Sequence, residues 1–236
     1  MATIDVVIPV YNEELVLAQS VNTVRQFLEE NLPQRYTIVI ADNASTDRTW
    51  EIAQALSQEH HDVAALHLDE KGRGRALRRA WLESAADIVS YMDVDLSTEL
   101  AAFPKLIQAI EGGYDIAIGS RLLRGSSVKR SFKRELTSRS YNFIITAMFR
   151  TKFSDAQCGF KALSSGVAQE LVPLIQDQEW FFDTELLILA EKKGYRIGEI
   201  PVAWIEDPDT RVAVAKTALD DLKGLLRLRF RSCHMQ

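Results

Sequence analysis

The sequence of 236 residues has few cysteines and histidines and no long apolar run. Its two cysteines, Cys158 and Cys233, lack the close spacing of a metal site, so we expect free thiols in a reducing compartment. No stretch reaches the ~18 apolar residues of a membrane span. The first residues, MATIDVVIPVYNEE, lack the basic flank and apolar length of a signal peptide. We therefore expect a cytoplasmic protein.

An excess of positive charge is also missing. The 28 lysines and arginines are outnumbered by 33 acidic residues, which gives a net charge of -5. This balance argues against a general nucleic-acid binder, so we expect no nucleic-acid partner. Hydrophobic residues make up 47% of the chain, enough for one sizeable core. With no internal repeat or linker, the sequence predicts one domain over residues 1–211 and a helical tail over 212–236.

Short apolar runs alternate with helix-like stretches along the first 120 residues. Such alternation predicts an α/β fold with a mostly parallel sheet. The expected strands are 4–10, 36–41, 64–68, 87–92 and 116–118, and the expected helices are 14–30, 47–59, 74–85 and 100–111. Residues 124–139 are polar and basic and are expected to form a mobile loop. Further strands are expected at 159–163 and 197–202, and further helices at 135–149, from 165, at 183–193 and at 212–231.

Two carboxylates follow the expected strand 87–92, in the segment Asp93-Val94-Asp95. Ligands of an open parallel sheet bind at the carboxyl ends of its strands. Alternation along an extended chain would send both side chains the same way. Carboxylate oxygens can hold Mg²⁺ or Mn²⁺ together with diphosphate oxygens. An Asp-x-Asp pair alone is also common in solvated loops, so its place at a strand end carries the metal hypothesis.

Two further turns have both a structural and a functional interpretation. The turn 41–47 could simply cap the following helix, or Asp42 could accept a hydrogen bond from a nucleobase. The basic segment 71–75 could be a flexible helix-capping turn, or it could contact a diphosphate. It lacks the Gly-Lys-Ser/Thr ending of a P-loop and the third glycine of a dinucleotide fingerprint.

Taken in order, these segments resemble the family 2 inverting glycosyltransferases. The segments are Val6–Glu14, Asp42–Asp47, Lys71–Gly74, Asp93–Asp95, Gly119–Arg121 and Asp155–Lys161. The glucose-type dolichyl- and polyprenyl-phosphate sugar synthases are the most similar branch, and Trp180–Glu185 and Glu199–Trp204 resemble it too. The resemblance spans about residues 4–212. It implies a GT-A (Rossmann-like nucleotide-diphospho-sugar transferase) fold, with helices flanking the central sheet.

The resemblance also implies roles for individual residues. The nucleoside pocket would be lined by Pro9, Tyr11, Glu13 and Asp42, with Lys71 near the diphosphate. The diphosphate and metal ion would be held by Asp93 and Asp95, with Ser97 as a further polar ligand. Phosphate groups would be contacted by Arg121, Arg134, Ser138 and Arg211. Asp155 would steer or deprotonate the acceptor.

Glucose transfer from UDP-glucose to a polyprenyl or dolichyl phosphate is therefore the predicted reaction. The alternatives are a GDP-mannose donor, a soluble sugar or metabolite as acceptor, a nucleotidyltransferase, and a non-catalytic nucleotide-sugar sensor. The Gln-x-x-Arg-Trp motif of processive synthases is absent from the sequence. The glycine loop reads Lys-Gly-Arg-Gly-Arg instead of the usual Gly-Lys-Gly form, which leaves its contacts open.

The tail has leucines at helical spacing, flanked by basic residues. The leucines are 219, 222, 225, 226 and 228, and the basic residues are Lys223, Arg227, Arg229 and Arg231. One interpretation is a helix that makes peripheral contact with an anionic membrane on its cytoplasmic face. The other is a helix that packs on its own domain or on a second copy of the chain in a homo-oligomer.

Overall fold

A seven-stranded sheet forms the centre of the protein, which a computed structural model describes over residues 1–206 and 214–231. The strands are β1 (Thr3–Val10), β2 (Arg35–Asn43), β3 (Val63–Leu68), β4 (Ile88–Met92), β5 (Ile116–Ser120), β7 (Phe160–Ser164) and β8 (Ile197–Pro201). Their order is β3-β2-β1-β4-β7-β5-β8, and only β7 runs antiparallel to its neighbours. The mostly parallel sheet predicted from the alternating pattern is confirmed.

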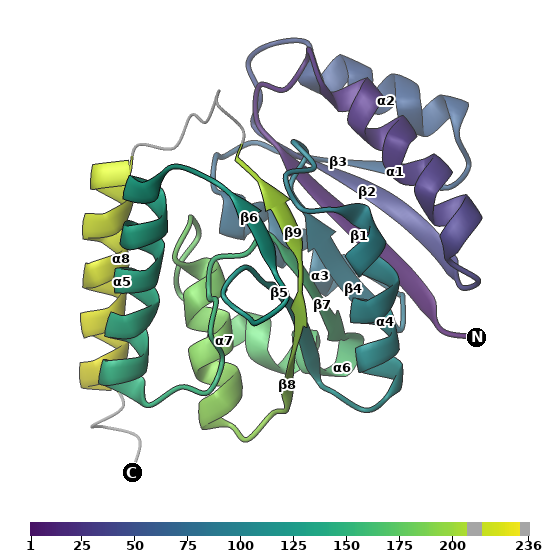
Figure 1. Ribbon diagram of the computed structural model, residues 1–236. Helices are drawn as coiled ribbons and strands as arrows, with labels where there is room; N and C mark the ends of the chain where they lie inside the picture. The colour runs from purple at the N-terminus through teal and green to yellow at the C-terminus, as the bar shows by residue number, and fades with distance from the viewer. Residues whose placement is uncertain (207–213, 232–236) are drawn as a thin grey trace.

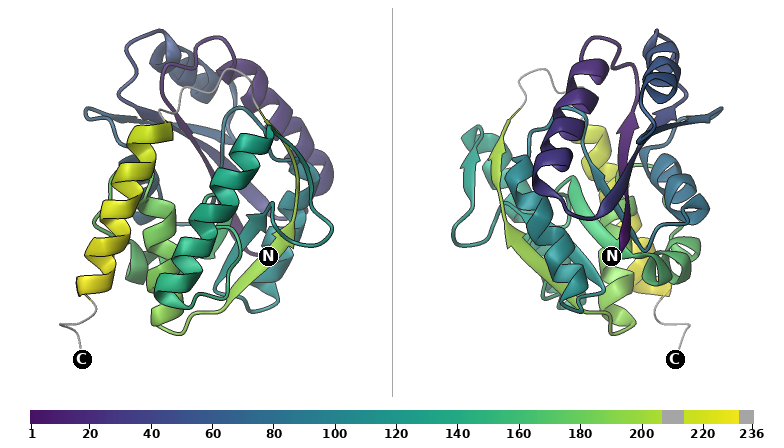
Figure 2. Two further views of the ribbon diagram at one scale, coloured as in Figure 1. Left: turned by 60° about the vertical axis from the view of Figure 1, so that its left-hand side comes forward. Right: turned by 90° about the vertical axis from the view of Figure 1, so that its right-hand side faces the viewer.

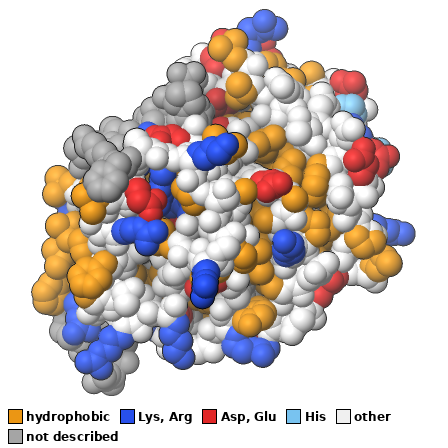
Figure 3. Space-filling model, in the orientation of Figure 1, with side chains coloured by type: hydrophobic (Ala, Val, Ile, Leu, Met, Phe, Trp, Pro, Cys, Tyr) orange, Lys and Arg blue, Asp and Glu red, His pale blue; other side chains and the backbone are white. Residues whose placement is uncertain are grey.

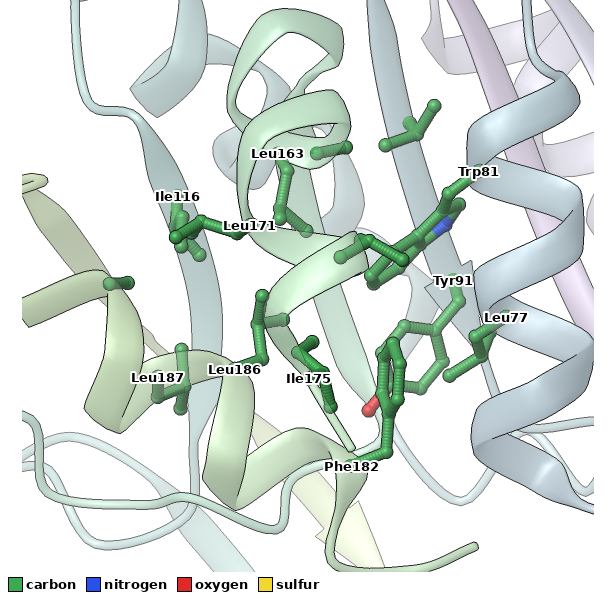
Figure 4. Close-up of a cluster of buried hydrophobic side chains, with 14 of the residues drawn as sticks. Leu77, Trp81, Tyr91, Ile116, Leu163, Leu171, Ile175, Phe182, Leu186 and Leu187 are labelled. Carbon is green, nitrogen blue, oxygen red and sulfur yellow. The ribbon is translucent and has the colours of Figure 1, made fainter. Parts of the chain in front are cut away.

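Helices cover both faces of this sheet (Figures 1 and 2). The helices are α1 (Leu17–Asn31), α2 (Thr49–Glu59), α3 (Arg73–Glu83), α4 (Phe103–Glu111), α5 (Phe132–Phe149), α6 (Ser165–Leu171), α7 (Phe182–Lys192) and α8 (Val214–Arg231), with 3-10 turns at Leu100–Ala102 and Val172–Leu174. One hydrophobic cluster joins α1, α2 and α4 to the sheet, and a second joins α3, α6 and α7. In the second, Trp81, Tyr91 and Phe182 meet with ring centroids 5.9 Å apart for each pair that involves Trp81 (Figure 4).

The basic segment 124–139 differs from the mobile loop expected there. Residues Ser127–Lys129 form a short strand, β6, which pairs in parallel with β9 (Ala203–Ile205). Helix α5 then begins at Phe132 instead of near residue 135. A three-residue strand has no periodicity of its own, and its partner lies more than 70 residues away, so the sequence pattern gave no signal for it.

The tail helix α8 packs against α5 and α7, as Figure 1 shows. Leu225 and Leu228 are buried in the core, and a Cβ at Gly224 would overlap the Phe181 ring. Arg227 turns inward and forms an ion pair with the buried Glu185, 2.5 Å from Nη2 to Oε2. The packing interpretation therefore holds for one face of α8. Its other face is exposed at Leu219, Leu222, Leu226 and Phe230.

Candidate active site

The candidate residues gather at one edge of the sheet, where the parallel strands end. Pro9 lies near the end of β1, Asp42 in the end of β2, and Asp93 directly after β4. Arg121 follows β5 in the same way. Because β7 is antiparallel, the loop before it reaches the same edge and brings Asp155 to Arg121. The topology thus brings together residues from five separate segments.

Asp42, which is predicted to line the nucleoside pocket, is fully buried. Its Oδ2 lies 2.6 Å from Nδ1 of His67, whose ring packs on Trp50 with centroids 4.9 Å apart. Its Oδ1 is buried without a hydrogen-bond partner in the described part of the chain. A buried acceptor without a partner is costly, so this oxygen is suited to an N–H donor from a ligand such as a nucleobase.

The loop after β1 lies beside the loop after β2 and carries Tyr11 and Glu13. The Asn12 backbone N–H donates to Oγ of Ser45 at 2.9 Å, which joins the two loops, and the Glu13 N–H donates to Oγ1 of Thr49, at the start of α2, at 2.7 Å. Nζ of Lys71 lies 3.5 Å from the centroid of the Tyr11 ring, a cation–π contact. These residues therefore share the end of the site that also contains Asp42.

Asp93 is held by an arginine that the sequence did not single out for a role. Arg73 donates from Nη2 to Oδ1 of Asp93 at 2.8 Å, and from Nη1 to Oδ2 of Asp183 at 2.7 Å. On the other side of Asp93, a Cβ at Gly159 would overlap the carboxylate. Arg73 therefore pairs with two carboxylates and is buried. Lys71, in the same loop, is exposed.

A buried cluster behind Asp93 balances these charges. Asp183 also accepts a hydrogen bond from the Tyr91 hydroxyl at 2.6 Å and pairs with Nζ of Lys161 at 3.1 Å. Burial alone would raise the pKa of Asp183, but Lys161 and Arg73 hold this pKa below its usual range. The carboxyl therefore stays ionised, and the cluster has two cations for two anions once Asp93 is included.

Asp95 lies in different surroundings from Asp93. The chain turns after β4, with the Leu96 N–H bonded to the Asp93 carbonyl at 3.2 Å, so the alternation expected of an extended strand does not apply here. The exposed Asp95 accepts from the backbone N–H of Ser97 at 2.9 Å. Asp93 is about half exposed.

The turn after β4 offers a divalent ion two carboxylates and a hydroxyl, those of Asp93, Asp95 and Ser97. Within residues 1–206 and 214–231, no group of three or more His, Cys, Asp or Glu side chains could hold a metal. Two carboxylates with a nearby hydroxyl fit Mg²⁺ or Mn²⁺, which usually bind one or two carboxylates and complete their shell with phosphate oxygens and water. The residues present therefore suit an ion that arrives with a diphosphate.

Arg121 and Asp155 form a buried, bidentate ion pair. The guanidinium donates from Nε and Nη2 at 2.8 and 2.9 Å, and the Arg121 backbone N–H adds a third bond to Asp155 at 3.0 Å. Burial alone would raise the pKa of Asp155, but Arg121 keeps this pKa below its usual range. An ionised carboxylate with three donors is suited to orienting Arg121 and is a poor proton acceptor.

Two further predicted phosphate contacts, Arg134 and Ser138, lie on α5. Arg134 pairs with Glu206 at 2.8 Å, and Glu206 also accepts from the Ser131 N–H at the start of α5. The Ser138 hydroxyl is buried and has no hydrogen-bond partner among the described residues. Arg211 lies outside the described residues, as does Cys233, whereas Cys158 is buried and forms no disulfide within the described part of the chain.

Curated relatives share most of this chain. It is 35% identical to Glycosyltransferase AglD of Haloferax volcanii over 95% of its own length and 36% of the relative. It is 29% identical to the dolichyl-phosphate beta-glucosyltransferase of Dictyostelium discoideum over 97% of the chain and 74% of the relative. It is also 32% identical to the dolichol-phosphate mannosyltransferase of Pyrococcus furiosus, over 95% and 63%. The chain thus spans about a third of the length of AglD.

Solved structures have the same architecture at lower sequence identity. Glucosyl-3-phosphoglycerate synthase from Mycobacterium tuberculosis, in complex with Mn²⁺ and UDP-glucose, aligns with a TM-score of 0.69 at 20% identity, over 97% of this chain and 79% of that one. This likeness confirms the predicted GT-A fold. The model of the family described as "Glycosyl transferase family 2" matches residues 5–172, the segment that contributes Asp42, Asp93, Asp95 and Arg121 to the sheet edge. The chain therefore belongs to glycosyl transferase family 2.

Proposed function

We propose that this protein transfers glucose from UDP-glucose to a polyprenyl or dolichyl phosphate with inversion at the anomeric carbon. One observation carries the proposal: the buried Arg121–Asp155 pair fixes a guanidinium at the sheet edge that also bears Asp93 and Asp95. The second arginine, Arg134, and the unpartnered hydroxyl of Ser138 lie on α5. The relatives named as dolichyl-phosphate glucosyltransferases support this acceptor and sugar. The family assignment sets aside the nucleotidyltransferase alternative.

A phosphate acceptor explains why the site is rich in arginine. The second pKa of a phosphate monoester is about 6, so the acceptor carries its own negative charge at neutral pH and needs little help from a base. The main obstacle is repulsion between the acceptor and the donor diphosphate, and Arg121 with Arg134 offsets that charge. We therefore assign Asp155 to orienting Arg121, since its carboxylate already accepts three hydrogen bonds from Arg121 and a fourth from the Gln157 N–H.

The site would work by positioning and charge stabilisation. A divalent ion, Mg²⁺ or Mn²⁺, would be held by Asp93, Asp95 and Ser97, and it would supply Lewis-acid stabilisation of the leaving diphosphate. Asp42 would accept an N–H of the base, and Lys71 would face the donor phosphates. Arg134 forms an ion pair with Glu206 in this structure, so an acceptor phosphate would have to displace the Glu206 carboxylate before it could bind Arg134. The phosphate oxygen of the acceptor would then attack the anomeric carbon in line while the bond from that carbon to the UDP phosphate oxygen breaks, and UDP would leave.

The test of this function is a matched screen of donors and acceptors. UDP-glucose and GDP-mannose are each supplied with Mg²⁺ or Mn²⁺ and a short polyprenyl phosphate, and the release of nucleoside diphosphate and the glycolipid product are measured. We expect transfer from UDP-glucose. Arg134→Ala should lower this transfer by about ten- to a hundredfold and spare slow donor hydrolysis by water, because water needs no phosphate clamp.

Other outcomes would separate the alternatives. Faster transfer from GDP-mannose would replace the sugar assignment, in line with the relative from Pyrococcus furiosus. Product formed only with soluble phosphorylated metabolites would replace the lipid acceptor. An equal loss of transfer and hydrolysis in Arg134→Ala would place this residue at the donor or in the fold.

We also propose that an apolar face shared by α5 and α8 contacts the membrane that holds the acceptor. Its exposed side chains are Leu136, Phe143, Ile144, Leu219, Leu222, Leu226 and Phe230. Figure 3 shows hydrophobic side chains gathered over these two helices, with basic side chains below them. Lys223 and Arg229 are exposed on α8, which suits anionic headgroups at about 1 kcal/mol each. No helix in the described ranges is long and apolar enough to cross a membrane.

Liposome binding tests this face. Phe143 and Phe230 are the most exposed of its side chains, at 73% and 67%. Phe143→Ser with Phe230→Ser should reduce co-sedimentation with anionic liposomes at least about tenfold, because each ring loses apolar burial. Binding should weaken at high salt, since the Debye length is ~8 Å at physiological ionic strength. Leu174→Ser, at an exposed apolar residue of the 3-10 turn Val172–Leu174 and so outside these two helices, is the control.

Activity on a detergent-soluble, short-chain acceptor should survive in the double variant, since the chemistry lies at the sheet edge. Arg227 is excluded from this test because it pairs with Glu185. A wild-type protein that never sediments with anionic liposomes would contradict the proposal. A concentration-dependent dimer that the double variant abolishes would instead assign the face to a homo-oligomer.

A further inference from the structure

The loop 154–157 supports Arg121 and is itself held by several other elements. Its first residue, Ser154, donates to Glu199 at 2.9 Å through its N–H and bonds to the Ser120 hydroxyl at 2.7 Å. The Ala156 N–H donates to Oδ1 of Asn142, on α5, at 2.9 Å. Asp155 therefore holds Arg121 from a loop whose neighbouring residues are fixed to the sheet and to α5.

The last residue of the loop is held by α8. The Gln157 side chain donates from Nε2 to Oδ2 of Asp221 at 3.0 Å, and the Gln157 backbone N–H donates to Oδ1 of Asp155 at 3.2 Å. Asp221 is 3% exposed, on the helix face that packs inward beside Gly224 and Leu225. A continuous chain of hydrogen bonds thus runs from α8 to the guanidinium of Arg121.

A carboxyl is an unusual choice for this inward face of α8. Burial raises the pKa of Asp221 to about 7, so its ionised form is disfavoured there by comparison with water. A leucine would suit a helix face packed on a core far better. Apolar packing therefore gives no reason for an aspartate here, whereas its hydrogen bonds with Gln157 and with the Tyr141 hydroxyl on α5 do. Gln157→Ala removes the first of these bonds and leaves Tyr141 unchanged.

We propose that Asp221 is a positioning residue for Arg121 and acts through the loop 154–157. Helix α8 then supports the acceptor-phosphate site indirectly, through the loop that holds Arg121. This inference rests on the proposed role of Arg121 at the acceptor phosphate. It goes beyond that role because it makes the docking of α8 a condition for the correct placement of the guanidinium.

The experiment compares Asp221→Ala and Gln157→Ala in the full chain, with a detergent-soluble polyprenyl phosphate as acceptor. We expect either change to raise the KM for the acceptor about tenfold, while the KM for the donor and its hydrolysis by water stay within about twofold. Asp221→Asn keeps an oxygen that can accept from Gln157 and should restore nearly wild-type kinetics. The half-buried Gln157 provides the test if Asp221→Ala does not fold.

Two controls separate positioning from looser packing of α8. Asp220→Asn changes the adjacent exposed carboxylate, which pairs only with the surface residue Lys223 among the described salt bridges, and should have no effect. Arg227→Met removes a different contact of α8, its ion pair with Glu185, and changes neither partner of the bond between Asp221 and Gln157. If Arg227→Met raises the acceptor KM as much as Asp221→Ala does, the effect is one of packing and the proposal fails.

A spectroscopic readout makes the test independent of the acceptor. The Nε–H resonance of Arg121 in ¹⁵N NMR reports its bond to Asp155 without any substrate. We expect this resonance to shift or broaden in Asp221→Ala and in Gln157→Ala, and to remain unchanged in Asp220→Asn. An unchanged resonance in both would overturn the positioning role. A shifted resonance in a protein that transfers nothing to polyprenyl phosphate would keep the role and refute the proposed function alone.

Discussion

Asp95→Asn should lower the turnover of sugar transfer by about two to three orders of magnitude, with little change in stability. Asp95 is exposed on the turn after β4, and its side chain is not part of the hydrophobic core. An asparagine oxygen carries no full negative charge and holds a hard divalent ion poorly. Because exposed substitutions change the free energy of unfolding by at most ~0.5 kcal/mol, we expect the thermal midpoint to move by only about 1–2 °C.

Direct titration with Mn²⁺ in the presence of UDP, followed by electron paramagnetic resonance, should show weaker binding in this variant. Glu99→Gln, an exposed carboxylate four residues further on, is the matched control and should keep wild-type turnover. Asp93→Asn should differ from Asp95→Asn in stability, because it also removes a negative charge that is paired with the buried Arg73. Wild-type turnover in Asp95→Asn with EDTA present would refute a metal-assisted reaction.

The fold follows from the sequence wherever periodicity is local. The strands of the first 120 residues are confirmed, with ends within about two residues of those predicted, because buried parallel strands form compact apolar runs between helical stretches. The antiparallel direction of β7 and the pairing of β6 with β9 were not predicted. Both depend on contacts between distant segments, which leave no mark on the pattern of a single segment.

The candidate site also contains residues that local pattern could predict and residues that depend on distant contacts. The motif residues Asp42, Asp93 and Arg121 could be placed at one edge because each follows a strand of a parallel sheet. Their roles in binding and catalysis remain predictions. The sequence pattern indicates Arg73 only as a basic residue of a glycine loop. It does not predict the pairing with Asp183, because the two residues are 110 positions apart. The available signal was weak: an aspartate opening a helix of otherwise mostly apolar residues, in the segment Trp180–Glu185.

The buried cluster behind Asp93 leads to the second large effect. Asp183→Leu should destabilise the protein by about 3–5 kcal/mol, because Arg73 and Lys161 lose a shared buried counter-charge. Urea unfolding would measure this loss. The folded-state pKa of Asp183 lies below its unfolded value, so the stability that it contributes is present above the unfolded pKa of about 4. This contribution is lost as the pH falls through the folded pKa. The difference in the free energy of unfolding between wild type and Asp183→Leu should therefore become smaller in acid.

A double variant separates this charge balance from the role of the cluster at the site. Asp183→Leu with Lys161→Met removes one buried cation along with the anion, so it should recover most of the lost stability. It should not recover turnover, because Nη1 of Arg73 still lacks its partner and Asp93 is no longer held in one place. If turnover returns together with stability, the cluster serves the fold alone. If the double variant is no more stable than Asp183→Leu, the pairing of Asp183 with Lys161 does not account for the loss.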